Sequence, residues 1–598
     1  MMKSYSLDTT AAAVVLFDIG ETLWTISESG YKRHTRIKIF RKEGYQWADG
    51  IIALNKGILR PSKFKAATYN IVNGKMETTI LTSEGFFTED YNEYIDVIRF
   101  AMPNVKEGSI IEYYYELPWR GLADWEFQRL IPTIWSEYNT YVFLRYLYDK
   151  LVIGYLTPNI HEEKMAYRAG VECKYERFVM KEIPAFRNEP FIPTSSNYKS
   201  RMSYNIATIG QFNIFSTWND LAIKYHDSEF FADNVARTGF LKKISLELTD
   251  KLETPDLKVL AIVDYVKRNM TWDNRYRHRT RDIKKAIENK TGNSAEINLM
   301  LLAMLRYAGL PADPVLISTR ENGFVRRETP NPYQFNHIII LTDLRGGKFL
   351  LDATNKNLSY DFLPESCLND YGYIAIREKA GWVKLENLKR SRVAVDCNFT
   401  IKDHSDLIGE MKIQKSGYDA EATRRAVLND GENKYTEAFF STQNVGVKEQ
   451  SFVNLNEENA PLVENHSVEM NGYLEGGPEV LYLNPIVLNR IEENPFKEET
   501  RLYPIDFKYP KETVYSAKFN IPEGFKIDEL PSSKMSLLPD NNGKFVYNIS
   551  SDGKTISATY QLVVNKSFFS LEEYPIVREF FRIVSDKCKE QVVLKLVK

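Results

Sequence analysis

Three short motifs place a hydroxyl, an imidazole and a carboxylate at separate points along the chain. They are Gly292-Asn293-Ser294, Phe335-Asn336-His337 and Leu351-Asp352-Ala353-Thr354. A nucleophile, a base that accepts its proton and an acid that orients the base are the parts of a triad for acyl transfer. Each residue alone has an ordinary explanation, because serine is common at helix starts and aspartate in turns. Only the occurrence of all three motifs in one chain, in this order, outweighs these separate explanations for Ser294, His337 and Asp352.

The hydroxyl must be positioned by a helix that begins at Ser294. Apolar residues cover nearly every face of the segment that follows, as in a helix buried inside a domain. They are Ile297, Leu299, Met300, Leu301, Leu302, Met304 and Leu305. Asn293 and Glu296 have the spacing of a helix cap, and Gly309 has the position of a helix end. We predict a helix from about Ser294 to Tyr307, whose first turn would favour a thiolate or a developing oxyanion.

The base and the acid are predicted on two short strands beyond this helix. Residues 335–341 and 348–352 are apolar runs of strand length, separated by Gly346-Gly347. A helix that leads into an antiparallel sheet is typical of an α+β domain. We expect His337 and Asp352 on adjacent strands, with hydrogen-bond reach of about 2.6 to 3.2 Å between Ser294 and His337.

The three motifs resemble, in order, the Cys, His and Asp motifs of the transglutaminase-like superfamily. Residues 302–310 also resemble the nucleophile helix of that family and its exit. The resemblance covers residues 240 to 385 and implies a papain-type core, in which a Cys-His-Asp triad forms a thioester and passes the acyl group to an amine or water. The rest of the chain resembles exported bacterial proteins in which such a core lies between two β-rich domains of uncharacterised function.

Ser294 departs from the family pattern, because the family has cysteine at this position. A thiol has a pKa of about 8.5, which a helix terminus and an imidazolium can bring below neutrality, whereas they cannot ionise an alcohol. Ser294 would act only if His337 removed its proton during attack. Three interpretations stay open: a cleft that binds without catalysis, which we favour; a working serine nucleophile; and an engineered Cys-to-Ser exchange.

Two further residues are candidates for substrate binding or for an oxyanion site. The resemblance implies an aromatic or polar residue near the oxyanion upstream of the nucleophile helix, where Trp272 stands, but an ordinary core tryptophan is the better interpretation. Asn293 precedes the nucleophile position. The basic run of residues 275–281 could receive an anion, but a solvated loop is the better interpretation.

The composition restricts the classes of partner. Of the 598 residues, 43% are hydrophobic and 26% charged, and the formal charge is -2. The composition therefore gives no sign of a nucleic-acid partner. No stretch approaches the ~20 apolar residues that cross a bilayer. Four cysteines without a CxxC pair and seven scattered histidines imply no metal and no cofactor. A disulfide between Cys367 and Cys397 is conceivable, but no pattern supports it.

The changes of sequence period predict three domains in an α+β multidomain chain. Residues 1–239 and 390–598 carry strand signals, such as the Asn73-Gly74 hairpin turn, and are expected to be mainly β, sandwich-like domains. Trp119, Trp125 and Trp135 in the first of them could bind sugar or peptide, but packing is the better interpretation. Residues 240–389 form the predicted transglutaminase-like core, where Thr254-Pro255 starts a helix.

We therefore expect an exported protein, periplasmic or on the cell surface, whose export signal was removed. Its function would be that of a pseudoenzyme that binds a peptide, a protein segment or a cell-envelope polymer in an open but partly walled cleft. One alternative is a serine-dependent amidase, peptidase or acyltransferase that uses Ser294, His337 and Asp352. Another is a structural scaffold with binding on the β-rich flanks.

Overall fold

The chain folds as two compact units in a computed structural model. The first contains Met1–Asn188, Ser195–Thr217 and Arg327–Asn331, and the second contains Glu189–Thr194, Trp218–Arg326 and Pro332–Lys598. The structure describes residues 2–597 except 56–59, 83–84, 91–94, 169, 211, 215–216, 345, 388 and 442–444. The second unit joins the middle and the C-terminal parts of the chain, so the domain limits near residues 240 and 390 stay predictions.

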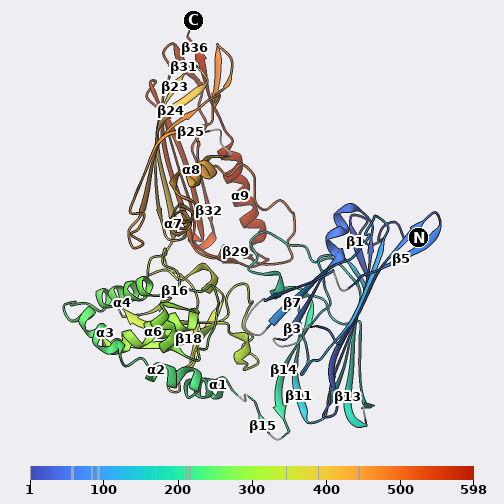
Figure 1. Cartoon of the computed structure of the whole chain (residues 1–598). Helices are drawn as coiled ribbons and strands as arrows, with labels where there is room; N and C mark the ends of the chain where they lie inside the picture. Colours follow the sequence, from blue (N-terminus) through green and yellow to red (C-terminus); the bar gives the residue numbers. More distant parts are fainter. Residues whose placement is uncertain are drawn as a thin grey trace. The chain divides into compact units, whose positions relative to one another are not determined.

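The first unit is built on an eight-stranded sheet with the order β12-β13-β10-β1-β2-β8-β4-β5 (Figure 1). Its strands are β1 (Ala13–Trp24), β2 (Ser29–Ile39), β4 (Lys63–Val72), β5 (Lys75–Ile80), β8 (Ile110–Leu117), β10 (Thr133–Phe143), β12 (Ile160–Arg168) and β13 (Val171–Ile183). The predicted hairpin turn joins β4 to β5, with φ of 49° at Asn73 and 76° at Gly74. Asparagine and glycine suit this turn because both tolerate the positive φ that it requires.

Two smaller sheets share a hydrophobic core with the large one. They contain β3 (Asp49–Asn55), β6 (Phe86–Asp90) and β7 (Ile95–Ala101), and β9 (Trp125–Glu126), β11 (Tyr146–Ile153), β14 (Arg201–Ile209) and β15 (Phe212–Asn213). Trp125 is 1% exposed and stacks on Tyr138 with ring centroids 5.1 Å apart. Packing, rather than a sugar or peptide, therefore accounts for Trp125, and Trp119 packs against the same core.

The middle of the second unit has a helical layer on a five-stranded sheet. The helices are α1 (Trp218–His226), α2 (Asn234–Ala236), α3 (Leu241–Thr249), α4 (Pro255–Asn269), α5 (Ile283–Asn289) and α6 (Ser294–Tyr307). The sheet order is β20-β19-β18-β21-β22, from β18 (Ala312–Ile317), β19 (His337–Leu344), β20 (Gly347–Leu351), β21 (Tyr371–Ile374) and β22 (Gly381–Lys384). Helix α6 packs against β18 and β19 and against α3, α4 and α5 (Figure 1).

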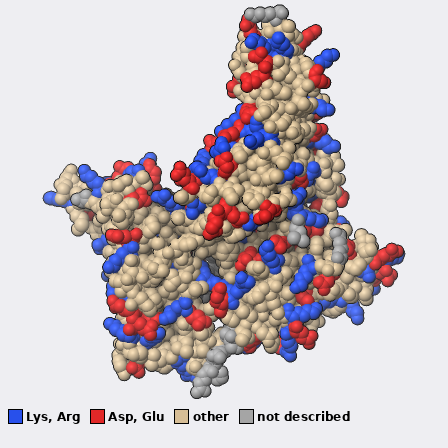
Figure 2. All heavy atoms as spheres, turned by 180° about the vertical axis from the view of Figure 1, so that it is seen from behind, with Lys and Arg blue, Asp and Glu red and all other residues tan. Residues whose placement is uncertain are grey.

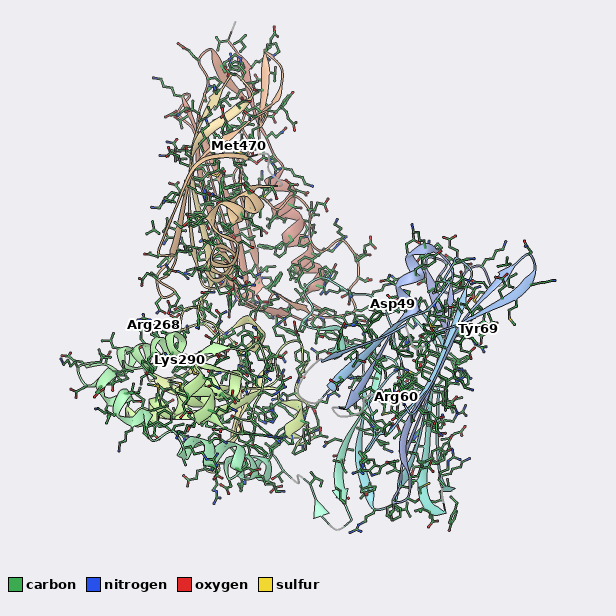
Figure 3. All side chains as sticks on the ribbon, viewed as in Figure 1. Asp49, Arg60, Tyr69, Arg268, Lys290 and Met470 are labelled. Carbon is green, nitrogen blue, oxygen red and sulfur yellow. The ribbon has the colours of Figure 1, made fainter. Side chains whose placement is uncertain are left out.

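Local sequence signals explain where these helices begin and end. Thr254 caps α4 by accepting a hydrogen bond from the backbone N–H of Leu257 at 3.3 Å, and Pro255 occupies the first helical position as predicted. Lys290, labelled in Figure 3, ends α5 with a φ of 56°. It leads into β17 (Thr291–Gly292), which pairs in parallel with β16 (Thr271–Trp272) just before α6.

The C-terminal part of the second unit is β-rich. Its eight-stranded sheet has the order β25-β26-β24-β23-β30-β34-β33-β32, and a four-stranded sheet has the order β27-β28-β36-β31. The long strands are β23 (Ser391–Lys402), β24 (Asp406–Ser416), β25 (Val445–Val453), β26 (Leu462–Met470), β30 (Lys511–Asn520), β33 (Gly543–Ser551) and β34 (Thr555–Val564). The short ones are β27 (Glu475–Gly476), β28 (Val480–Leu483), β29 (Ile505–Asp506), β31 (Phe525–Glu529), β32 (Lys534–Leu538), β35 (Phe568–Phe569) and β36 (Val592–Leu596). Both sheets contribute to one core, with α7 (Tyr418–Asp430), α8 (Glu432–Phe440) and α9 (Tyr574–Cys588) beside them.

The surface in view (Figure 2) carries charges of both signs, and the four cysteines form no disulfide. Figure 2 shows Lys and Arg interspersed with Asp and Glu on the face in view, as a net charge of -2 suggests. Across the described residues, no helix has the length and hydropathy to span a membrane. All four cysteines are buried free thiols. The disulfide considered between Cys367 and Cys397 is therefore not formed.

Candidate active site

Helix α6 begins with a complete capping box. The Asn293 side-chain oxygen accepts hydrogen bonds from the backbone N–H groups of Ala295 and Glu296 at 2.9 and 3.2 Å. In return, Glu296 accepts one from the backbone N–H of Asn293 at 2.8 Å. The cap fixes Ser294 at the first position of the helix, as predicted. It also occupies the side-chain oxygen of Asn293, which leaves that oxygen no evident role toward a substrate.

The Ser294 hydroxyl is bonded in both directions to the backbone of Arg277. It accepts the Arg277 N–H at 2.8 Å and donates to the Arg277 carbonyl at 3.1 Å. The backbone N–H of Ser294 donates to the Arg275 carbonyl at 3.1 Å. Thus the proton of the hydroxyl points to a carbonyl, and an N–H group that could stabilise an oxyanion is also occupied.

His337 and Asp352 form a fully buried pair. His337 Nε2 lies 2.6 Å from Asp352 Oδ2, and both side chains are 0% exposed. Asp352 Oδ1 accepts from the Thr354 N–H at 2.7 Å and from its hydroxyl at 2.6 Å. Burial acts to raise the pKa of Asp352, but the His337 charge and hydrogen bond, with those of Thr354, outweigh it and lower the pKa. The carboxylate is thereby held ionised against the imidazole.

The hydrogen bond expected between Ser294 and His337 is not formed. His337 Nδ1 is buried without a hydrogen-bond partner. The physical reason is that one backbone group, at Arg277, supplies both the donor and the acceptor that the Ser294 hydroxyl needs. His337 begins β19 and Asp352 directly follows β20, which are neighbouring strands.

The segment of residues 272–277, here called the strap, covers the pair. The Tyr276 ring meets the His337 ring edge-on, with centroids 5.2 Å apart, and the Trp272 ring lies 4.9 Å from that of Tyr276. The Trp272 indole N–H donates to the Arg275 carbonyl at 3.1 Å. Because the strap packs on the site, Ser294 and His337 are both 0% exposed. The open cleft expected from the sequence is therefore wrong for this arrangement.

The basic run is part of the strap and of the loop after it, and two of its arginines have partners in the described structure. The Arg275 guanidinium pairs with Asp273 at 2.5 Å. The Arg279 guanidinium lies 5.7 Å from the centroids of the Phe230 and Tyr333 rings. Trp272 contributes to the strap by a tilted ring contact with Tyr276 and by its bond to the Arg275 carbonyl, rather than by an indole N–H directed at a reacting atom.

Asn298 is a positioning residue that sequence reasoning missed. It lies one helical turn after Ser294 and is 0% exposed. Its side-chain N–H donates to the Ile338 carbonyl at 2.8 Å, and its side-chain oxygen accepts the Ala353 N–H at 2.9 Å. It therefore fixes the residues next to His337 and Asp352 against the nucleophile helix. A polar residue within an otherwise apolar helix was the available signal.

Cys367, which the sequence suggested only as a conceivable disulfide partner of Cys397, lies beside the acid of the pair. Its Sγ donates to Asp352 Oδ2 at 3.5 Å, from η6 (Glu365–Cys367). Burial and the Asp352 carboxylate raise the pKa of this thiol well above its ordinary value. A thiolate is disfavoured at this place, so Cys367 is not a relocated nucleophile.

The turn that carries Cys367 is tied to both sides of the site. The Tyr276 hydroxyl donates to Ser366 Oγ at 2.8 Å. Arg320 donates from its backbone N–H to the Ser366 carbonyl at 2.9 Å and from Nη1 to the Leu368 carbonyl at 2.8 Å. The same Nη1 lies 2.9 Å from Asp506 Oδ2, in the C-terminal part. The turn of Cys367 thus contacts the strap through Tyr276 and also contacts Asp352. Arg320 connects the same turn to the C-terminal β-rich part.

Two parts of the chain match models of known protein families. Residues 242–377 match the family model of the transglutaminase-like superfamily, and residues 479–594 match a domain of unknown function, DUF3858. No curated protein matches the chain.

Two solved structures resemble the chain. One, from Parabacteroides distasonis ATCC 8503, is described as a "putative protease"; it has 12% sequence identity, a TM-score of 0.60, and covers 98% of this chain and 99% of that chain. The other, a "putative cysteine protease" from Cytophaga hutchinsonii, is 16% identical with a TM-score of 0.18 and covers 39% of this chain and 74% of that chain. The first shares the fold along almost the whole chain. Residues 242–377 therefore form a transglutaminase-like core within a multidomain protein whose flanking regions are β-rich.

Proposed function

We propose that this chain is a noncatalytic transglutaminase-like protein whose core binds an extended peptide or protein segment. The observation that carries the proposal is the engagement of the Ser294 hydroxyl with Arg277 in both directions, while His337 Nδ1 has no partner. A serine nucleophile requires the opposite arrangement, in which the hydroxyl proton is directed at the imidazole. The missing thiol and the misdirected hydroxyl therefore act together against acyl transfer.

The strap supports a role in binding. The Tyr276 ring meets His337 edge-on and has the Trp272 ring beside it. The Tyr276 hydroxyl bonds the strap to Ser366, and the Trp272 indole N–H bonds to Arg275 within the strap. Aromatic side chains of this kind supply large contact areas to a peptide at low entropic cost. A ligand segment would lie against these rings of the strap, near the position where related enzymes receive glutamine or peptide substrates.

Casein is a suitable probe, because its unfolded chain offers many extended glutamine-containing segments. We expect the full chain to bind immobilised casein reversibly, and Tyr276→Ala to raise the dissociation constant at least about tenfold. Tyr333→Ala, which removes an exposed ring outside the strap, serves as the matched control. No binding of casein by the unaltered chain, or equal effects of the two variants, would refute the proposed binding site.

A serine-dependent amidase or peptidase is the second candidate, and one observation favours it. The buried His337–Asp352 pair has complete support from Thr354 and Asn298, which is the arrangement that a general base needs. A fluorophosphonate probe would then label the unaltered chain, and Ser294→Ala would abolish the label. We expect no labelling in either protein.

Export and a purely structural role stay predictions. Export would be tested by fractionating cells that express the full gene. The scaffold alternative predicts casein binding that survives every change in the strap, so the Tyr276→Ala comparison also separates it from the proposed function.

A further inference from the structure

The fold brings together three potential metal ligands that lie far apart in the sequence. They are an imidazole, a carboxylate and a thiol from His337, Asp352 and Cys367, and all three are buried. Their ligand atoms lie within 4.8 Å of one another. Neither the spacing of the cysteines nor that of the histidines contains a metal motif, which is why the sequence implied no metal.

We propose that His337, Asp352 and Cys367 bind a zinc ion through Nε2, Oδ2 and Sγ. One nitrogen, one oxygen and one sulfur are ligands that zinc accepts together, and the thiol disfavours magnesium and calcium. Three protein ligands leave one position of a tetrahedral ion for water. This inference concerns the same buried site as the proposed function but does not depend on peptide binding.

Two of the three separations between ligand atoms are close to those that zinc requires, and the third is within 4.8 Å. Nε2 and Oδ2 are 2.6 Å apart and Oδ2 and Sγ are 3.5 Å apart. Bonds of about 2.0 to 2.3 Å in a tetrahedral arrangement place ligand atoms roughly 3.3 to 3.7 Å from each other. The imidazole and the carboxylate must therefore separate by less than about 1 Å, while the thiol keeps its distance from the carboxylate.

The surroundings orient two of the ligands. Thr354 donates twice to Asp352 Oδ1, which leaves Oδ2 directed at His337 and Cys367. Arg320 holds the turn of Cys367 through the carbonyls on either side of it, at Ser366 and Leu368. Such outer hydrogen bonds keep metal ligands in place and contribute to affinity.

Binding requires a defined movement of protons. Cys367 must lose its S–H proton as the zinc–sulfur bond forms, and Nε2 must be free of hydrogen, so a neutral ring carries its proton on Nδ1. At least one proton therefore leaves the site for each zinc ion bound. Calorimetry in two buffers of different ionisation enthalpy counts these protons, and affinity should fall as the pH falls.

The test measures metal content and cobalt spectra of the full chain. Protein prepared with excess zinc and then desalted should retain one zinc ion per chain, and cobalt in its place should give a thiolate-to-cobalt absorption band. Cys367→Ser should remove the band and weaken zinc binding by more than the tenfold to about hundredfold typical of outer-sphere changes. Cys397→Ser, which alters another buried thiol, should leave both readouts unchanged.

Three results would overturn the proposal: no retained zinc, no thiolate band with cobalt, or equal zinc loss in Cys367→Ser and Cys397→Ser. If Cys367→Ser does not fold, the cobalt spectrum of the unaltered chain decides the question. Failure of casein binding together with retained zinc would count against the proposed function alone, and the reverse would count against the zinc site alone.

Discussion

Asn298 accepts a hydrogen bond from the backbone N–H of Ala353 at 2.9 Å, inside the core and one helical turn away from Ser294. With its bond to the Ile338 carbonyl, the same side chain joins the nucleophile helix to both strands that position the His337–Asp352 pair. The relative placement of the three triad positions therefore depends on one carboxamide that touches none of them.

Replacing that carboxamide should destabilise the core. Asn298→Leu leaves the Ala353 N–H and the Ile338 carbonyl buried without their side-chain partner, and each unsatisfied group costs about 1 to 3 kcal/mol. We expect the free energy of unfolding of the second unit to fall by at least about 2 kcal/mol, measured in urea. Asn269→Ala, which removes a part-buried amide at the end of α4, is the control and should cost about 1 kcal/mol or less. Equal losses would show that Asn298 has no special role.

Restoring a thiol should restore reactivity. In Ser294→Cys, the helix terminus and the His337 imidazole favour a thiolate, which the alcohol cannot form. We expect incorporation of a biotinylated amine into casein by Ser294→Cys, and none by the unaltered chain or by Ser294→Ala. Incorporation by the unaltered chain that Ser294→Ala abolishes would establish a serine enzyme instead.

Acid should weaken the second unit through Asp352. Its folded-state pKa is lowered, so its ionised form contributes stability above about pH 4, the ordinary aspartate range, and that contribution is lost as the pH falls through the folded pKa. Unfolding by urea between pH 6 and pH 2 should show a shallower decline in Asp352→Asn than in the unaltered chain. Asp343→Asn, at an exposed residue, serves as control, and its stability should decline as steeply as that of the unaltered chain. If its decline is as shallow as that of Asp352→Asn, the effect cannot be assigned to Asp352.

A buried ion pair in the C-terminal part should be sensitive to the loss of one partner. Lys415 Nζ lies 2.6 Å from Glu464 Oε1, with side chains 8% and 0% exposed. Glu464→Gln leaves the ammonium without its countercharge, which costs about 3 to 5 kcal/mol. The exposed Lys434–Asp430 pair, with side chains 72% and 49% exposed, is the control, and Asp430→Asn should cost under about 1 kcal/mol. Thermal unfolding of both variants provides the comparison.

The elements that position the site could be predicted because their signals are local. The α6 boundaries, its cap at Asn293 and the start of α4 at Pro255 all follow from a few adjacent residues. The contacts of Ser294 could not be predicted, because Arg277 reaches it from a loop without regular structure. Cys367 was missed for a similar reason: it meets Asp352 only through tertiary folding.

The Arg320–Asp506 pair sets a lower limit on the piece of this protein that can be studied alone. Its side chains are 7% and 11% exposed, and Arg320 belongs to the transglutaminase-like core while Asp506 belongs to the C-terminal β-rich part. A fragment that ends near residue 390 would lack Asp506. The Arg320 guanidinium, which holds the turn of Cys367, would then have lost its ion-pair partner. We therefore expect residues 242–377 to be less stable as an isolated fragment than within a fragment that also contains Asp506.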